Sequence, residues 1–230
     1  MAQTIVFAQS KGGTGKSTMA FQVATALMST GATVGAIDFD VQASLALFAG
    51  IREQTEAEPI EMLEIPRPED YEEYVKRSPL DYIVVDTGGY DEETQRLAIF
   101  LADVVVVPFR DSMADIGGMM GFQENLVMSL REKWNEFEVC CVVNFAHIFA
   151  GKSIEEAAIE VDSMEGMRYL GGVNGDKTFC LRDRKIYKTS LDAGKGVTEL
   201  QNKDEGKTAA TEEIERLTFL ILEEIKRRNG

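Results

Sequence analysis

The chain has 230 residues, of which 44% are hydrophobic and 27% charged, a composition typical of a globular protein that buries a substantial core. Its 39 acidic residues outnumber 24 basic ones, and the resulting net charge of −15 excludes nucleic-acid binding by bulk charge, so DNA binding would need a local basic patch. One histidine and three cysteines form no zinc-binding or disulfide pattern, which favours buried thiols in a reducing cytoplasm.

Strand-like apolar runs alternate with helical patterns along the whole chain. This alternation indicates βαβ units and predicts an α/β fold with three layers, in which helices flank a mostly parallel, twisted sheet on both faces. We expect one domain over 1–230. In chain order, the predicted elements are a strand at 4–9, a helix at 16–29, strands at 33–37 and 82–85, a helix at 92–101, a strand at 104–107, a helix at 115–133, a strand at 139–143, and helices at 153–165 and 211–228.

Residues 52–93 form an acidic stretch, with 14 acidic residues against four basic ones. We expect a surface excursion between the second and third core strands, and a solvated face is favoured over an acidic partner-binding site. Farther along, Ser153 and Glu156 match a capping box at the start of the helix expected at 153–165.

The glycine-rich segment SKGGTGKST at 10–18 lies between a strand and a helix, the context that a phosphate-binding loop requires. Glycines let backbone amides converge on phosphate oxygens, and the helix N-terminus adds the positive end of its dipole. Lys16 would reach the terminal phosphates and Ser17 would ligate Mg²⁺. The segment therefore predicts ATP and Mg²⁺ as cofactors, with candidate nucleotide-binding residues Gly12, Gly13, Thr14, Gly15, Lys16, Ser17 and Thr18.

This loop departs from the ordinary Walker A motif, because Ser10 stands where the first glycine would fall and Lys11 is an additional lysine. KGGTGKST resembles the deviant Walker A motif of the ParA/MinD family of P-loop ATPases. The resemblance covers nearly the whole chain in motif order and implies a P-loop NTPase fold. It also implies an ATP-dependent homodimer in which Lys11 reaches the partner's ATP and neutralises charge in the transition state, as an arginine finger does elsewhere.

Two further motifs follow predicted strands. DFDVQAS at 38–44 resembles the family's A′ motif, with Val41 in place of the usual proline. The resemblance implies that Asp40 orients or activates the attacking water and that Asp38 helps to hold the Mg²⁺ shell. Asp86 ends an apolar strand as in a Walker B motif, and we expect it on the metal's water shell. The glycines at 88 and 89 would make the next loop mobile, but mobility alone does not indicate a switch.

The base side of the predicted site is less defined. Asn144 follows the run 139–143, where the family uses an asparagine to contact adenine, and the alternative is that it caps a turn. The segment LRDRKIY at 181–187, together with PFRDS at 108–112, resembles the MipZ branch of the family.

A local basic patch is the feature that would link this ATPase to DNA. The candidate DNA-binding residues that form this patch are Arg182, Arg184, Lys185, Lys188 and Lys195. We expect the patch to be extended by Lys203, Lys207 and the terminal residues 226–228. The alternative is that these residues form a solvated helix face.

Three biological roles remain open from the sequence. The leading one is a ParA-type partition ATPase that binds nonspecific DNA as an ATP-bound dimer, associates with the nucleoid and is stimulated by a ParB-like adaptor or centromere-binding protein. A MipZ-like regulator of division-site positioning is the second. The third is a MinD-like membrane switch, which would bind the membrane through a short amphipathic helix after the last core helix. Only two residues follow the last predicted helix, so we do not expect membrane binding.

Overall fold

An eight-stranded sheet lies at the centre of the molecule, and every strand pairing in the described residues is parallel. The computed structural model describes residues 1–64, 70–88, 93–134, 137–147, 150–171, 177–200 and 205–229. The strand order is β3-β2-β4-β1-β5-β6-β7, and β8 also pairs with β6. The strands are β1 (Gln3–Phe7), β2 (Val34–Asp38), β3 (Glu61–Met62), β4 (Tyr82–Asp86), β5 (Val104–Phe109), β6 (Val139–Ala146), β7 (Met167–Tyr169) and β8 (Cys180–Arg182).

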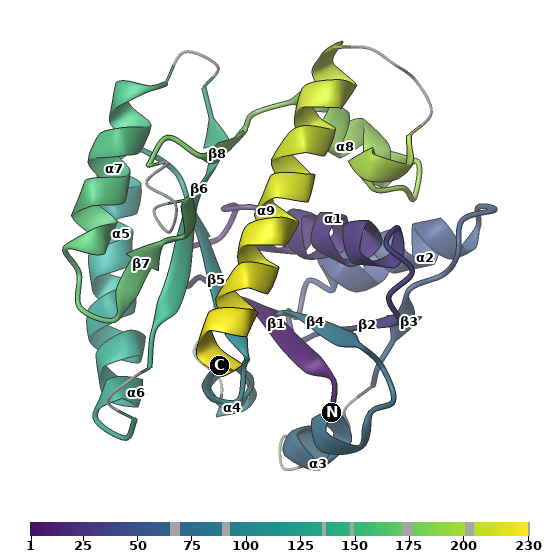
Figure 1. The fold of residues 1–230 in the computed structure, drawn as a ribbon, viewed down its shortest axis with the longest axis horizontal. Coiled ribbons are helices and arrows are strands. Elements are labelled where there is room, and N and C mark those ends of the chain that lie inside the picture. Colours follow the sequence, from purple (N-terminus) through teal and green to yellow (C-terminus); the bar gives the residue numbers. More distant parts are fainter. Residues whose placement is uncertain are drawn as a thin grey trace.

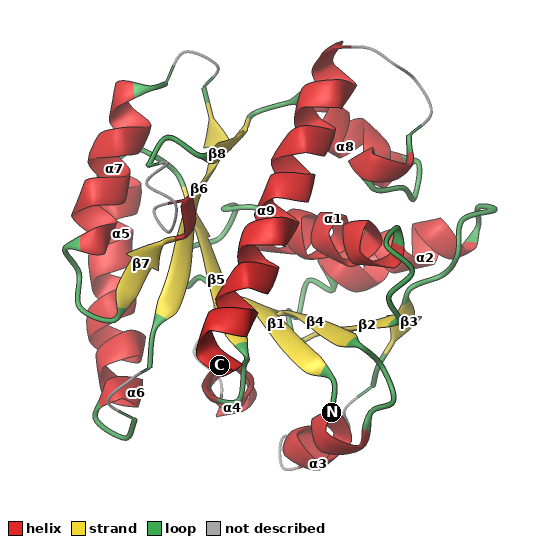
Figure 2. Ribbon diagram, viewed as in Figure 1, coloured by secondary structure: helices red, strands yellow, loops and turns green. Residues whose placement is uncertain are grey.

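Helices cover both faces of this sheet (Figures 1 and 2). One face packs against α1 (Lys16–Met28), α2 (Ser44–Glu53), α8 (Lys185–Asp192), the 3₁₀ turn η3 (Val197–Glu199) and α9 (Glu205–Asn229). The other face packs against α3 (Asp70–Arg77), α4 (Glu93–Phe100), α5 (Met113–Phe122), the π-helical η1 (Gln123–Val127), α6 (Met128–Arg131) and α7 (Lys152–Asp162). The predicted three-layer α/β architecture is therefore confirmed.

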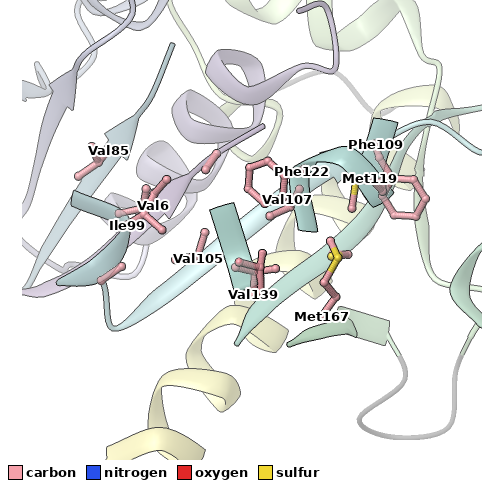
Figure 3. Packing of buried hydrophobic residues seen from close by; sticks show 14 of the residues in the cluster. Val6, Val85, Ile99, Val105, Val107, Phe109, Met119, Phe122, Val139 and Met167 are labelled. Carbon is pink, nitrogen blue, oxygen red and sulfur yellow. The ribbon is translucent and has the colours of Figure 1, made fainter. Parts of the chain in front are cut away.

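Alternate residues of each central strand enter the two apolar cores. Val6, Val105 and Val107 pack on the face shown in Figure 3, together with Phe122 and Met119 of α5. Their neighbours along the strands pack on the opposite face, against α1 and α9. Because both faces are buried, the strands are apolar without a break, which is the pattern that the sequence showed. The three cysteines are free and buried, as predicted.

Two helix starts differ from the predictions. Helix α7 begins at Lys152 with Gly151 as its N-cap, so the predicted capping box at Ser153 is wrong; the Ser153 hydroxyl instead donates to Asp111 Oδ2 at 2.7 Å. The helix expected at 115–133 begins at Met113, because Ser112 accepts a hydrogen bond from the backbone N–H of Asp115 as an N-cap. It is also interrupted by η1, and the Asn125 amide donates to the carbonyl of Gly121 beside that interruption.

The acidic stretch at 52–93 adds more to the fold than a surface excursion would. It supplies the edge strand β3 and helix α3, whose Tyr71 is fully buried. Arg52, also fully buried, forms paired hydrogen bonds of 2.7 Å with both carboxylate oxygens of Glu199 and so joins α2 to η3. Residues 65–69 and 89–92 of this stretch lie outside the described part. Within the described part, no helix is long and apolar enough to cross a membrane.

Candidate functional site

The loop between β1 and α1 depends on two glycines in the left-handed backbone region. Gly13 has φ +73° and Gly15 has φ +90°. A Cβ atom on Gly15 would lie 2.3 Å from Asn144 Nδ2 and 2.9 Å from the Phe145 ring, so this position requires glycine for space as well as for conformation. The loop thus folds closely against β6 while its residues 11–13 remain exposed.

The start of α1 offers a buried lysine and free backbone N–H groups. Gly15 makes no side-chain cap, and the first turn contains no acidic residue. Lys16, in that turn, is 6% exposed and forms no ion pair with any described residue. A buried ammonium group normally has an anionic partner. The N-terminal end of α1 is therefore suited to a phosphate, which would contact both the lysine and the free backbone N–H groups.

A buried carboxylate faces the same loop from the end of β4. Asp86 is fully buried, and neither of its oxygens has a well-formed hydrogen bond from a described residue. Burial raises its pKa to about 7, and the neighbouring Asp38 and Asp40 carboxylates act in the same direction. The Ser17 hydroxyl and the Lys16 charge oppose that rise. Such a carboxylate is suited to a cation that would complete its contacts.

The other two predicted acidic residues lie at the end of the neighbouring strand. The Asp38 Cα is in register with that of Asp86, which places both carboxylates at the same sheet edge. Asp38 accepts hydrogen bonds from the backbone N–H groups of Asp40 at 2.9 Å and of Ala46 at 3.0 Å. Asp40 accepts one from the N–H of Gln42 at 2.9 Å, so its carboxylate is held in a tight turn beside the loop.

These groups fit a magnesium ion that keeps part of its water shell. No cluster of three or more histidine, cysteine or acidic side chains within the described ranges could hold a metal alone. Mg²⁺ commonly takes one or two carboxylates and completes its octahedron with water and substrate phosphates. Ser17, Asp86 and Asp38 are of the right kind and in the right place for that arrangement, and the unsatisfied Asp86 oxygens are its main support.

Asn144 lies inside a strand and contacts the glycine-rich loop. It lies within β6, because the strand continues to Ala146. Its side-chain amide donates to the carbonyl of Thr14 at 2.7 Å, and both residues are buried. The next residue, Phe145, has φ +58°, and its ring lies 5.2 Å from the Arg110 guanidinium. In this structure Asn144 fixes the loop, and contact with a base stays a prediction.

Two side chains that the sequence analysis did not single out contact the loop. Arg110, which directly follows β5, donates to the carbonyl of Gly13 at 3.0 Å. Asp115 forms an ion pair with Lys11, with 2.8 Å between Nζ and Oδ1. Burial raises the pKa of Asp115, but hydrogen bonds from Lys11 and Ser112 outweigh it and leave the pKa lowered. The S-x-x-D pattern from Ser112 to Asp115 could have revealed this helix start.

The structure divides the predicted basic patch. Lys185 and Lys188 are exposed one turn apart on α8, and Lys195 is partly exposed. The two arginines instead have internal acceptors: Arg184 donates to Glu213 at 2.7 and 2.9 Å, and Arg182 to the carbonyl of His147 at 2.6 Å.

The terminal basic residues do not extend this patch, contrary to the prediction. Arg227 binds Glu138 at the start of β6, whereas Arg184 binds Glu213. The two contacts are fourteen residues apart on α9, or about 21 Å at 1.5 Å per residue. Residue 203 lies outside the described ranges.

Comparison with known proteins gives one family and a consistent fold. The family described as ATPase MipZ matches residues 3–76 and 69–132, which together make more than half of the chain. Protein ParA of Rhizobium radiobacter is 26% identical over 226 residues, which are 96% of each chain.

Two solved structures are similar over nearly the whole chain. The ATP complex of a McdA variant from Cyanothece has a TM-score of 0.67 at 18% identity, over 95% of this chain and 96% of that one. The structure of pNOB8 ParA bound to nonspecific DNA has a TM-score of 0.63 at 14% identity, over 99% and 98%. At these identities the likeness concerns the fold.

Proposed function

The chain belongs to the MipZ family of ATPases, within the ParA/MinD group of nucleotide hydrolases, and on this premise we propose that it is a Mg²⁺-dependent partition ATPase that binds DNA as an ATP-bound dimer. The observation that carries the proposal is a pair of buried groups at the same sheet edge whose contacts are incomplete. Lys16 forms no ion pair with a described residue, and neither Asp86 oxygen has a well-formed hydrogen bond, although the Ser17 hydroxyl and the Lys16 charge both act on this carboxylate. ATP with its cation would satisfy both groups.

Each residue then has a role that its surroundings support. Backbone N–H groups of residues 12–18 and the Lys16 ammonium would bind the phosphates, and Ser17 with Asp86 and Asp38 would hold the ion. Bound Mg²⁺ supplies charge neutralisation at the phosphates. Asp40, fixed by its turn, would orient the attacking water and accept its proton. Lys11 would leave Asp115 and reach the partner's nucleotide, which makes dimerisation and hydrolysis depend on each other.

DNA binding would use the exposed lysines of α8. Lys185 and Lys188 form no ion pair with described residues, and Lys195 is close in sequence. The solved relative on nonspecific DNA has the same fold, which supports this choice of partner. A ParB-like adaptor or centromere-binding protein would stimulate hydrolysis, and the ATP-bound form would associate with the nucleoid from the cytoplasm.

The decisive experiment measures binding of the Asp40→Ala protein to generic duplex DNA by fluorescence anisotropy, with Mg²⁺ and either ATP or ADP, over a salt series. We expect salt-sensitive binding with ATP only, because the variant retains ATP in the dimer. Changing Lys185 and Lys188 together to alanine should reduce the slope of the logarithm of the DNA association constant against log salt by about 2 for each protomer that contacts DNA, since each phosphate contact contributes about 0.9.

Two controls separate the parts of this proposal. Lys152→Ala removes an exposed lysine from α7, on the opposite face of the sheet, and should leave the salt slope unchanged. Lys16→Ala should lose ATP binding itself, measured with a fluorescent ATP analogue. Equal DNA binding with ADP would contradict the DNA switch, whereas unchanged ATP affinity in Lys16→Ala would overturn the ATPase assignment to this site.

Lys11 and Asp115 give a separate prediction on dimerisation. Lys11→Ala should bind ATP as a monomer, because the trans contact is lost. Asp115→Asn should dimerise at up to about thirtyfold lower protein concentration, because the two Lys11 side chains of a dimer no longer have to leave ion pairs worth up to about 1 kcal/mol each. Sedimentation velocity with a non-hydrolysable ATP analogue measures both. Normal ATP-dependent dimerisation of Lys11→Ala would refute the trans role.

A MipZ-like regulator of division-site positioning is the second candidate, favoured by the family match. The ATP-bound dimer would then act on a division protein as well as on DNA. The gene's surroundings discriminate between the two roles: an adjacent gene for a small DNA-binding protein on a plasmid supports partition, and a lone chromosomal gene supports positioning.

A further inference from the structure

A cavity of about 970 Å³ opens at the edge of the sheet opposite the glycine-rich loop. It forms where α4 ends, β5 begins, the segment after α6 enters β6, and the last turn of α9 passes over them. Figure 1 shows the C-terminal end of α9 beside α4. The strands start at this edge, whereas the residues assigned to ATP follow the ends of the strands, so nothing in the proposed reaction uses the cavity.

Aromatic side chains form one wall of this cavity. The rings of Phe100 and Trp134 meet edge to face with centroids 5.8 Å apart, and Phe137 lies 6.1 Å beyond Trp134. Phe137 is buried, but Phe100 is 36% exposed and Trp134 is 44% exposed. Exposed aromatic rings beside a hollow are typical of a surface that anchors an apolar side chain of a partner.

Cations surround this wall. Arg131, Lys133, Arg227 and Arg228 line the cavity. The three arginines pair with carboxylates, namely Arg131 with Glu165, Arg227 with Glu138 and Glu224, and Arg228 with Glu224. Of the two carboxylates that line the cavity, Asp103 is already engaged by the N–H and hydroxyl of Thr4. Lys133, which is exposed, and Arg227, which is half-exposed, are therefore the cations that an incoming carboxylate can reach.

The arginines that line the cavity are held in place before any partner arrives. The fully buried Glu224 accepts hydrogen bonds from Arg168, Arg227 and Arg228. Arg131 donates to the carbonyl of Phe137 at 2.7 Å, next to the aromatic wall. Groups that are already ordered lose little conformational entropy on binding. Lys133 is exposed and has no ion pair in the described part of the chain.

We propose that this cavity binds an acidic peptide segment of a partner protein, which places an aromatic or aliphatic side chain against Trp134 and carboxylates on Lys133 and Arg227. Charge complementarity selects this occupant: its carboxylates match these two cations, and its apolar anchor matches the exposed rings. Duplex DNA keeps its bases stacked inside the helix and offers no such anchor, and its phosphates would approach Glu138 as well as the cations. The inference is independent of the proposed ATPase cycle.

The test selects peptides from a random displayed library on the full chain and measures them by fluorescence of Trp134, the chain's one tryptophan. We expect enriched sequences in which an aromatic or aliphatic residue is flanked by Asp or Glu. The best peptide, made synthetically, should shift the Trp134 emission and bind about tenfold or more weakly to Lys133→Glu. Lys152→Glu, a charge reversal on α7, should bind as the wild type does.

Several outcomes would overturn the proposal. Selection of basic or purely polar peptides, or equal binding by Lys133→Glu, would remove it. Competition by duplex DNA at low salt would assign the cavity to nucleic acid. Nucleotide-independent self-association that Lys133→Glu abolishes would assign the face to a second copy of the chain. Circular dichroism of each variant checks the fold, and Phe100→Ala gives an independent loss of the anchor if Lys133→Glu proves unstable.

Discussion

Asp86→Asn is expected to stabilise the nucleotide-free, metal-free protein while it destroys the proposed activity. In the folded protein burial raises the pKa of Asp86 from 3.8 to about 7, so its ionised form is held at a cost. A difference of about three pKa units corresponds to about 4 kcal/mol of unfolding free energy at about pH 8, as an upper value. The neutral amide avoids this cost, and ATP hydrolysis should fall by roughly a hundredfold because a metal-binding carboxylate is missing.

The contribution of Asp86 to the free energy of unfolding should depend on pH. Between the unfolded and folded pKa values the folded protein binds one more proton at Asp86 than the unfolded chain does. Stability from this group is therefore complete below about pH 4 and decreases until about pH 7. Urea denaturation with EDTA should show this decrease in the wild type and its loss in Asp86→Asn.

Asp38→Asn is the matched control for this change. Asp38 accepts two backbone N–H bonds, so the amide should destabilise the protein, by about 1–2 kcal/mol. If Asp86→Asn proves less stable than the wild type at about pH 8, the ionised Asp86 carboxylate does not destabilise the folded protein, and this interpretation is wrong.

Gly15→Ala should destabilise the protein by about 3 kcal/mol and remove nucleotide binding. The left-handed backbone at φ +90° costs an L-residue about 1–2 kcal/mol, and the new Cβ would lie 2.3 Å from the amide of Asn144. Overpacking adds about 1–3 kcal/mol, because Asn144 is buried, bonded to Thr14 and unable to move freely. The movement that relieves the clash would displace the loop on which ATP depends.

Gly12→Ala is the control for the glycine prediction. A Cβ there meets no atom within 4 Å, and its backbone is not left-handed, so the unfolding free energy should change little. Thermal unfolding without nucleotide, followed by titration with a fluorescent ATP analogue, measures both variants. Equal stability of the two alanine variants would show that the loop is not held against β6 as described.

The order and layering of the fold follow from local pattern, and so does most of the candidate site. Buried parallel strands require continuous apolar runs, and Asp38 and Asp86 lie at the same sheet edge because each ends such a run; that their two strands are neighbours is known from the structure. The contacts between distant segments left no comparable signal. The Lys11–Asp115 pair, the Asn144–Thr14 bond and the buried Arg52–Glu199 pair each depend on a tertiary arrangement that residue spacing does not encode.

The errors have local physical causes. Ser153 matched a capping box, but its hydroxyl has a better-placed acceptor in Asp111, so the helix starts one residue earlier. The sequence predicted that the terminal basic residues extend the patch near Lys188, because their charges have the same sign. A long helix carries them to the opposite edge of the sheet, where Glu138 and Glu224 engage them.

The central place of β1 has a consequence for how the protein is made. β1 is synthesised first, yet Phe7 is in register with Asp86 on one side and Val106 on the other. During translation β1 therefore lacks at least one of its two neighbours until β5 has left the ribosome, which takes about 5–20 s at ordinary elongation rates. The apolar run 4–8 is exposed to chaperones and to aggregation in that interval. ATP can stabilise the nascent chain only after the interval, once the strands that form the proposed site have paired.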